Sequence, residues 1–191
     1  MAHRVCPVWI GYLLLSPLRK LLQNPEKILA GMLQQGMTVL DIGPGMGFFS
    51  IPMARMVGRN GKVICVDMQE GMLKVLRKRA TRAGVAGQIG ARLCGQNTLG
   101  LQDCGGKVDF ALAFAMVHET PNAEELLMET AAALKPAGRL LVAEPRGHVK
   151  EPDFEATVSL AERCGFQVIA RPKIWRSRAV LLTKSLETLA K

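Results

Sequence analysis

The chain has 191 residues, of which 49% are hydrophobic and 5% aromatic, so it is long enough for one well-packed core and too short for two ordinary domains. Its formal net charge of +9 would attract an acidic partner, a nucleic acid or a membrane surface, but charge alone selects none of them. Five scattered cysteines without a CxxC pair or metal-ligand spacing predict no metal site and fit a reducing cytoplasm.

Residues 1–36 are expected to precede the main domain. The apolar stretch from Val5 to Leu15 contains Pro7 and Gly11 and is too short to cross a bilayer, so we expect no transmembrane segment there. We interpret residues 5–22 as an N-terminal extension. Pro25 to Gln34 is predicted to form a helix that packs on the core.

From Met37 onward, apolar segments of strand length alternate with amphipathic helical segments, which is typical of a parallel α/β sheet. The expected strands, in chain order, cover residues 37–42, 62–66, 89–94, 108–115, 139–144, 166–175 and 179–183. The expected helices cover residues 48–57, 69–83, 122–134 and 152–164. The last two strands are expected to meet at a turn over Arg176 and Ser177.

The first expected strand ends in an acid and opens into alternating glycines, in the segment Val39-Leu40-Asp41-Ile42-Gly43-Pro44-Gly45-Met46-Gly47. Glycines can take positive φ and let a ligand approach bare backbone, and the following helix would direct its free N–H groups at that ligand. A dinucleotide-binding fingerprint needs a glycine or alanine at the position of Phe48. The spacing therefore argues against NAD.

This segment resembles the first motif of the class I S-adenosylmethionine (SAM)-dependent methyltransferases. The resemblance covers residues 37–184 and implies one SAM-binding domain over residues 37–191. Its fold would be α/β, a Rossmann-like three-layer sandwich with a seven-stranded, mostly parallel sheet whose last strand is antiparallel. An acid suits SAM, which carries an ammonium and a sulfonium, whereas it would repel a pyrophosphate.

The resemblance also implies which residues hold the cofactor. The loop residues Gly43, Pro44, Gly45 and Gly47 would pack under the methionine part of SAM, and Asp41 would help to hold its amino group. Asp67, at the end of the second strand, would accept the ribose hydroxyls, or it could instead cap the next helix. The remaining cofactor-binding candidates are Met68, along the adenine face, Gln96 or Asn97, which could accept a bond from the adenine amino group, and Phe114.

The ends of the fourth and fifth strands carry the candidate catalytic residues. His118 could act as a general base or could cap the next helix. Glu144, Arg146 and His148 could orient or deprotonate a methyl acceptor. The fourth strand lacks the Asn/Asp-Pro-Pro-Tyr/Phe signature of amino-methylating nucleic-acid enzymes and is more similar to the small-molecule and quinone-methylating branch.

Two basic sets could form a nucleic-acid surface. Lys74, Arg77, Lys78, Arg79 and Arg82 fall at helical spacing and are interpreted as the solvated face of a helix. The second set, Arg171, Lys173, Arg176 and Arg178, is accompanied by one aromatic residue, Trp175.

The expected function is transfer of a methyl group from SAM to a small-molecule acceptor, which could be apolar, by in-line displacement, with S-adenosylhomocysteine as the product. Cys6, in the extension, is a further candidate for covering the acceptor pocket. An RNA methyltransferase, suggested by the basic charge, and a non-catalytic SAM-binding or interaction module stay open as alternatives. The acceptor and the oligomeric state are left open.

Overall fold

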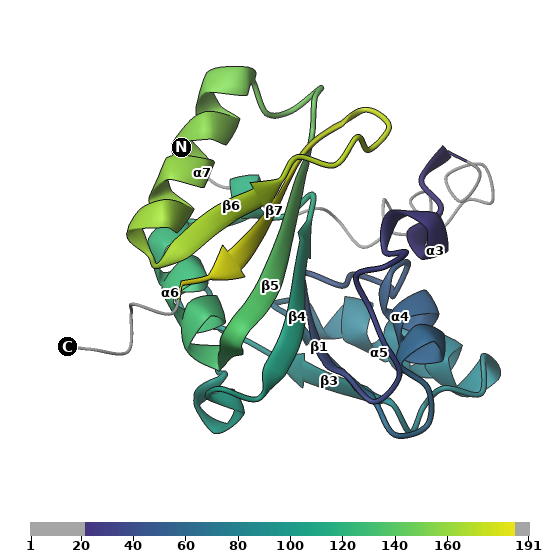
Figure 1. Ribbon diagram of the computed structural model, residues 1–191. Coiled ribbons are helices and arrows are strands. Elements are labelled where there is room, and N and C mark those ends of the chain that lie inside the picture. Colours follow the sequence, from purple (N-terminus) through teal and green to yellow (C-terminus); the bar gives the residue numbers. More distant parts are fainter. Residues whose placement is uncertain (1–21, 186–191) are drawn as a thin grey trace. The chain divides into compact units, whose positions relative to one another are not determined.

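A computed structural model describes residues 22–185 of the chain, which divide into two compact units, residues 22–94 and 95–185. Figure 1 labels their helices and strands. Cys6 and nearly all of the expected extension lie outside the described residues. The described residues contain seven strands, and each unit is described separately below.

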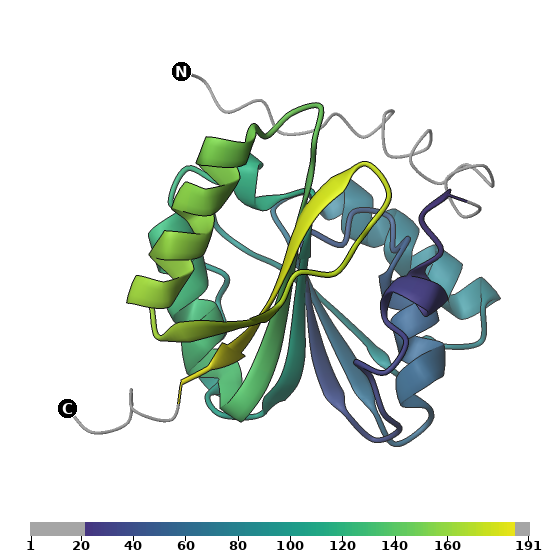
Figure 2. The same ribbon diagram turned by 45° about the horizontal axis from the view of Figure 1, so that its top comes forward.

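The first unit contains three parallel strands in the order β3-β2-β1, namely β1 (Thr38–Ile42), β2 (Lys62–Asp67) and β3 (Ile89–Leu93). β1 and β2 are buried along almost their whole length, as their continuous apolar sequences predict for strands covered on both faces. Helices α4 (Ser50–Val57) and α5 (Glu70–Arg82) lie on one side of these strands, with α3 (Pro25–Ile28) beside α4 (Figures 1 and 2). α5 packs through the apolar stripe Met72, Leu73, Leu76 and Ala80.

Two helices of this unit differ from the expected ones. The helix expected over residues 25–34 stops at Ile28, because Gly31 takes a left-handed conformation (φ 73°) that an α-helix cannot continue. The helix expected from Phe48 begins at Ser50, because the turns of the glycine-rich segment run on to Phe49. Both changes lengthen loops and leave the strands where the sequence placed them.

The second unit contains four strands in the order β4-β5-β7-β6, namely β4 (Val108–Phe114), β5 (Leu134–Pro145), β6 (Phe166–Ala170) and β7 (Ser177–Lys184). β4 and β5 are parallel, and β7 is antiparallel to both β5 and β6. Helices α6 (Ala123–Ala133) and α7 (Glu151–Arg163) lie on the same side of these strands (Figures 1 and 2). The expectation of a mostly parallel sheet with an antiparallel last strand is confirmed.

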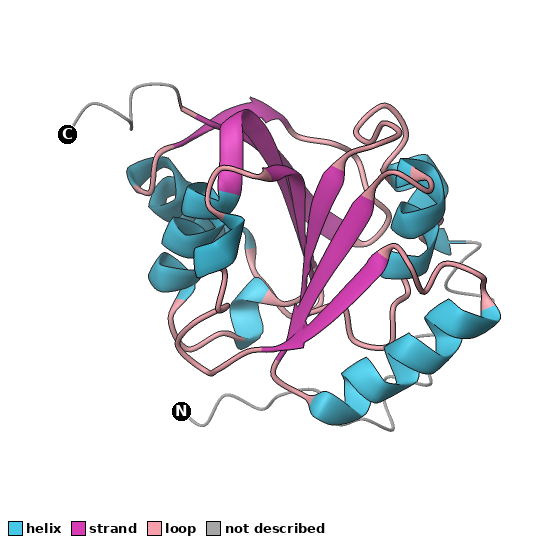
Figure 3. Cartoon of the chain, turned by 90° about the horizontal axis from the view of Figure 1, so that it is seen from below, coloured by secondary structure: helices cyan, strands magenta, loops and turns pink. Residues whose placement is uncertain are grey.

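Two strands of this unit have different bounds from the expected ones. β6 ends at Ala170 and not at Trp175, because the β6–β7 pairing shifts register after Val168 and Pro172 has no N–H to donate to a ladder. β5 begins at Leu134, before the expected start at Arg139, and an irregularity in its pairing with β4 accommodates Lys135 to Gly138. The loops that follow the strands are drawn in pink in Figure 3.

The carboxyl ends of the strands carry the buried acids. Asp41 is the last residue but one of β1, and Asp67 is the last residue of β2. Because the two strands are parallel, both acids lie at the same edge of the first unit. Glu144 lies near the carboxyl end of β5, and the chain leaves β4 at the same edge of the second unit. Each unit therefore presents one edge where polar side chains gather against an apolar core.

Candidate functional site

The loop after β1 adopts the backbone conformation that its glycines predict. Gly43, Gly45 and Gly47 have φ values of 67°, 53° and 82°, so all three lie in the left-handed region that other residues rarely enter. The prediction of a tight, glycine-dependent turn is confirmed.

Gly45 and Gly47 serve different purposes in this loop. A Cβ atom at Gly47 would lie 2.2 Å from Leu76 Cδ1, so helix α5 packs directly against the backbone there. A Cβ atom at Gly45 would meet nothing within 4 Å. Packing accounts for Gly47, whereas the space beside Gly45 is open to a ligand.

Asp41 is a buried carboxyl group, with 3% of its surface exposed. Ser50, the first residue of α4, donates its hydroxyl to Asp41 Oδ2 at 2.5 Å. Burial raises the pKa of Asp41 to about 7; the Ser50 hydrogen bond opposes this rise and the charge of Asp67 adds to it. Asp41 therefore titrates near neutral pH.

Asp67 ties the glycine-rich loop to the start of α5. Its Oδ2 accepts the Gly45 N–H at 3.0 Å, and its Oδ1 accepts the Gln69 N–H at 2.8 Å. Burial raises the pKa of Asp67, and the backbone hydrogen bonds from Gln69, Gly45 and Met68 oppose that rise. Asp67 is not the cap of α5, because the N-cap is Gln69 and no side chain caps this helix. A carboxylate offers about four acceptor positions, so the two backbone hydrogen bonds leave room for ribose hydroxyls.

The two acids make this edge of the first unit a place for a cation. The charge of Asp67 raises the pKa of Asp41, and within residues 22–185 no lysine or arginine forms an ion pair with either acid. A positively charged ligand would relieve that repulsion, and a pyrophosphate would add to it. The open backbone at Gly45 and this acid pair fit SAM.

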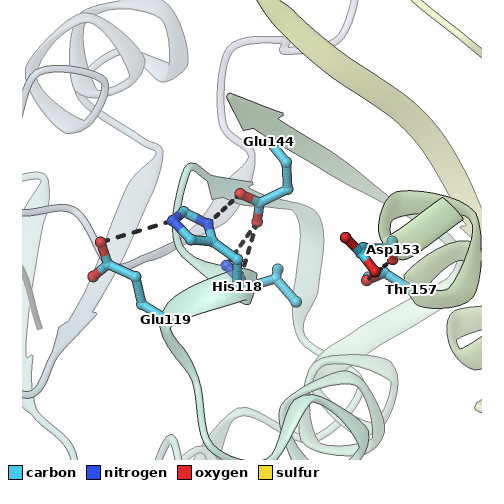
Figure 4. Close-up of polar contacts among 6 residues, drawn as sticks. His118, Glu119, Glu144, Asp153 and Thr157 are labelled. Atoms are coloured by element: carbon cyan, nitrogen blue, oxygen red, sulfur yellow. Dashed lines mark hydrogen bonds and ion pairs between the residues drawn. The ribbon is translucent and has the colours of Figure 1, made fainter. Parts of the chain in front are cut away.

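Glu144 organises the corresponding edge of the second unit. It is 2% exposed and accepts the Val117 N–H at 2.8 Å and the His118 N–H at 3.4 Å through Oε1. Its Oε2 lies 2.5 Å from His118 Nδ1 (Figure 4). One buried carboxylate therefore fixes both the backbone of the short helix η2 (Val117–Glu119) and the ring of His118.

This contact sets the protonation of His118. Because a carboxylate can only accept, Nδ1 carries the proton and Nε2 is the basic atom of the neutral ring. The hydrogen bond that His118 donates to Glu144 raises the pKa of His118 against the effect of burial, and Glu119, with Oε1 3.9 Å from Nε2, raises it further. A left-handed residue, Ala115 (φ 57°), turns the chain from β4 into this arrangement.

His148 and Arg146 occupy the loop after β5. The His148 ring stacks edge-on against His118, with 5.7 Å between the ring centroids. Arg146 is exposed and donates its Nε to the Ser177 carbonyl at 3.2 Å, while its N–H donates to the Arg176 carbonyl. The structure thus joins His118, Glu144 and His148, and uses Arg146 to anchor the start of β7.

The remaining sequence candidates lie on loops and strand ends. Gln96 and Asn97 are exposed on the loop after β3, whose far end is held by Glu129 Oε1 accepting the Leu99 N–H at 3.0 Å. Met68 and Phe114 are half-buried at the ends of β2 and β4. Sequence reasoning missed Ser50 and Glu129, because their partners are distant in the chain and no local pattern marks them.

Two negative observations concern residues 22–185 only. They contain no helix that is long and apolar enough to span a membrane. They also contain no cluster of three or more histidine, cysteine, aspartate or glutamate side chains that could hold a metal ion.

Comparison with known proteins identifies the family. A family model described as a methyltransferase domain matches residues 33–180. The chain belongs to this family. The match takes in both edges described above, and it confirms the resemblance of the Asp41–Gly47 segment to a methyltransferase motif.

Individual methyltransferases agree with this assignment. The chain is 34% identical over 123 residues to the ubiquinone/menaquinone biosynthesis C-methyltransferase UbiE of Escherichia fergusonii, covering 62% of this chain and 47% of that protein. It is 30% identical over 142 residues to UbiE of Edwardsiella ictaluri, covering 72% and 53%. The chain thus spans about half the length of these relatives.

A solved methyltransferase shares the fold. A SAM-dependent methyltransferase from Aquifex aeolicus superposes with a TM-score of 0.83 at 25% identity, covering 94% of this chain and all of that one. This likeness, with the strand order of each unit, confirms the expected Rossmann-like methyltransferase fold.

Proposed function

We propose that this chain is a SAM-dependent methyltransferase that acts on a small-molecule acceptor. The observation that carries the proposal is the pair of buried acids, Asp41 and Asp67, beside a loop of left-handed glycines with open space at Gly45. SAM supplies an electrophilic methyl group on its sulfonium. Asp41 would bind the amino group, Asp67 the ribose, and Gly43 to Gly47 the methionine part; Met68, Gln96, Asn97 and Phe114 stay proposed adenine contacts.

We further propose that the acceptor is a small, apolar, quinol-like molecule, because the UbiE relatives are named as C-methyltransferases of ubiquinone and menaquinone biosynthesis. Removal of a quinol hydroxyl proton would make a neighbouring ring carbon nucleophilic. That carbon would take the methyl group from the sulfonium, S-adenosylhomocysteine would leave, and the carbon's own proton would then be lost to restore the ring. His118 Nε2 would accept the hydroxyl proton, and Glu144 would orient the ring of His118 and stabilise the imidazolium. His148 would pack against the ring of His118. A cytoplasmic location is a separate part of the proposal.

Isothermal titration calorimetry tests the cofactor. The full chain is expected to bind one SAM and no NAD⁺, and Asp67→Asn is expected to bind SAM more weakly because it loses a charged acceptor. Binding of NAD⁺ in place of SAM would contradict the proposal. Release of S-adenosylhomocysteine with a panel of quinols then separates an enzyme from a module that only binds the cofactor.

Imidazole NMR titration tests the base independently of an acceptor. His118 is expected to titrate above its ordinary pKa of about 6.5 because of Glu144, and Glu144→Gln is expected to lower that pKa. The spectrum of His118→Gln assigns the signal. Methyl transfer should rise with pH through the same midpoint, since only the neutral ring accepts a proton. A midpoint that Glu144→Gln leaves unchanged would contradict this role.

A further inference from the structure

Helix α5 contacts the cofactor loop through a residue that the sequence placed on its solvated face. Arg79 donates its Nη1 to the carbonyl oxygen of Met46, which lies between Gly45 and Gly47. The residue is half-buried, whereas Lys78 and Arg82 beside it are exposed. The interpretation of the whole basic run as solvated is therefore wrong for Arg79.

The hydrogen bond from Arg79 fixes one particular peptide plane. The Met46 carbonyl belongs to the peptide that joins Met46 to Gly47, and the N–H of the same peptide donates to the Pro44 carbonyl at 2.9 Å. The plane is thus bonded at both ends. Because glycines flank Met46 and glycine backbones have wide conformational freedom, the plane would be poorly fixed without these bonds.

Partial burial of the charged Arg79 side chain costs free energy. Burial lowers the pKa of its guanidinium, and within the described residues its hydrogen-bond partner is a neutral carbonyl and not a carboxylate. Arg77, two residues earlier in the helix, is exposed and pairs with Glu70 at 2.6 Å. A desolvated cation without a counter-charge adds little to stability, which favours a role in the loop.

We propose that Arg79 is a positioning residue of the cofactor site, which sets the Met46–Gly47 peptide and so gives the loop its binding conformation before the cofactor arrives. The inference rests on the proposed SAM site. A preformed loop lowers the entropy lost on binding, so Arg79 would act on affinity without touching the cofactor.

The test compares Arg79→Met with Arg79→Lys and the control Arg82→Met. Calorimetry with S-adenosylhomocysteine, well below the unfolding temperature, is expected to show about tenfold weaker binding for Arg79→Met, which corresponds to the loss of one hydrogen bond of about 1.4 kcal/mol. Arg79→Lys keeps a donor and should restore most of the affinity, and Arg82→Met should bind like the wild type. Hydrogen exchange of the 43–49 amides should quicken in the unliganded Arg79→Met variant only.

Each outcome decides a separate question. If the wild type binds S-adenosylhomocysteine and Arg79→Met binds equally well with a lower unfolding temperature, Arg79 only stabilises α5 and this inference fails. If the wild type does not bind, the proposed function itself fails. Should Arg79→Met not fold, Arg79→Gln, with a shorter neutral donor, takes its place under the same expectations.

Discussion

In the proposed SAM site, Asp41 would make cofactor binding sensitive to pH. Burial raises its pKa to about 7, and only the ionised carboxyl would attract the SAM ammonium. The ionised fraction rises from about one tenth at pH 6 to about nine tenths at pH 8, so SAM affinity should rise about tenfold across this range. Calorimetry at several pH values measures it. Asp41→Asn should show no such rise, and Asp153→Asn, on the exposed start of α7, should keep it.

The same titration should lower the stability of the folded chain as the pH rises, whereas it should raise SAM affinity. Folding raises the pKa of Asp41, so its contribution to stability is complete below the pKa of the unfolded chain, about 3.9, and is lost as the pH rises through about 7. Without cofactor, Asp41→Asn should therefore gain stability relative to the wild type as the pH rises to 8, measured by urea unfolding. A constant difference between the two proteins would contradict the assigned pKa.

At the scale of the element, two glycines of the β1–α4 loop are expected to affect folding and cofactor binding differently. Gly47→Ala places a Cβ atom against the fully buried Leu76 and should lower the unfolding free energy by about 1–3 kcal/mol. Gly45→Ala meets open space, so it should cost about 1 kcal/mol for its left-handed conformation and mainly weaken SAM binding. Urea unfolding and calorimetry measure the two effects.

The matched control for this pair is Gly87→Ala. Gly87 lies in an exposed turn with open space around it, and its φ is not positive. Neither stability nor SAM affinity should change in that variant by more than about 0.5 kcal/mol. Equal losses of stability in Gly45→Ala and Gly47→Ala, with equal affinities, would show that the loop is purely structural.

At the scale of the whole molecule, three members of the C-terminal basic set contact neighbouring side chains. Arg171 pairs with Glu155 through two hydrogen bonds, and Arg178 pairs with Glu151. Arg176 lies over the ring of Trp175, 5.4 Å from its centroid. These contacts divide the C-terminal basic set among local partners, which weakens the case for an RNA surface made of it.

The sequence predicted most where a pattern is local. The run from Val39 to Gly47 predicted a buried strand, an acid at its end and left-handed glycines, all of which follow from neighbouring residues. It did not predict that Arg79 bonds Met46, 33 positions away, or that Glu144 holds His118, 26 positions away. Such partners depend on how strands and helices pack, and a local pattern does not record that. The cofactor and acceptor contacts themselves stay predictions.

The left-handed conformation of Ala115 has a consequence for protein engineering. A glycine there would relieve about 1 kcal/mol of strain, so a search for stabilising changes would favour Ala115→Gly. The same change would loosen the bend that delivers His118 to Glu144, since glycine accepts many more backbone angles. A more stable chain obtained in this way would hold the ring of His118, the proposed base, less firmly against Glu144.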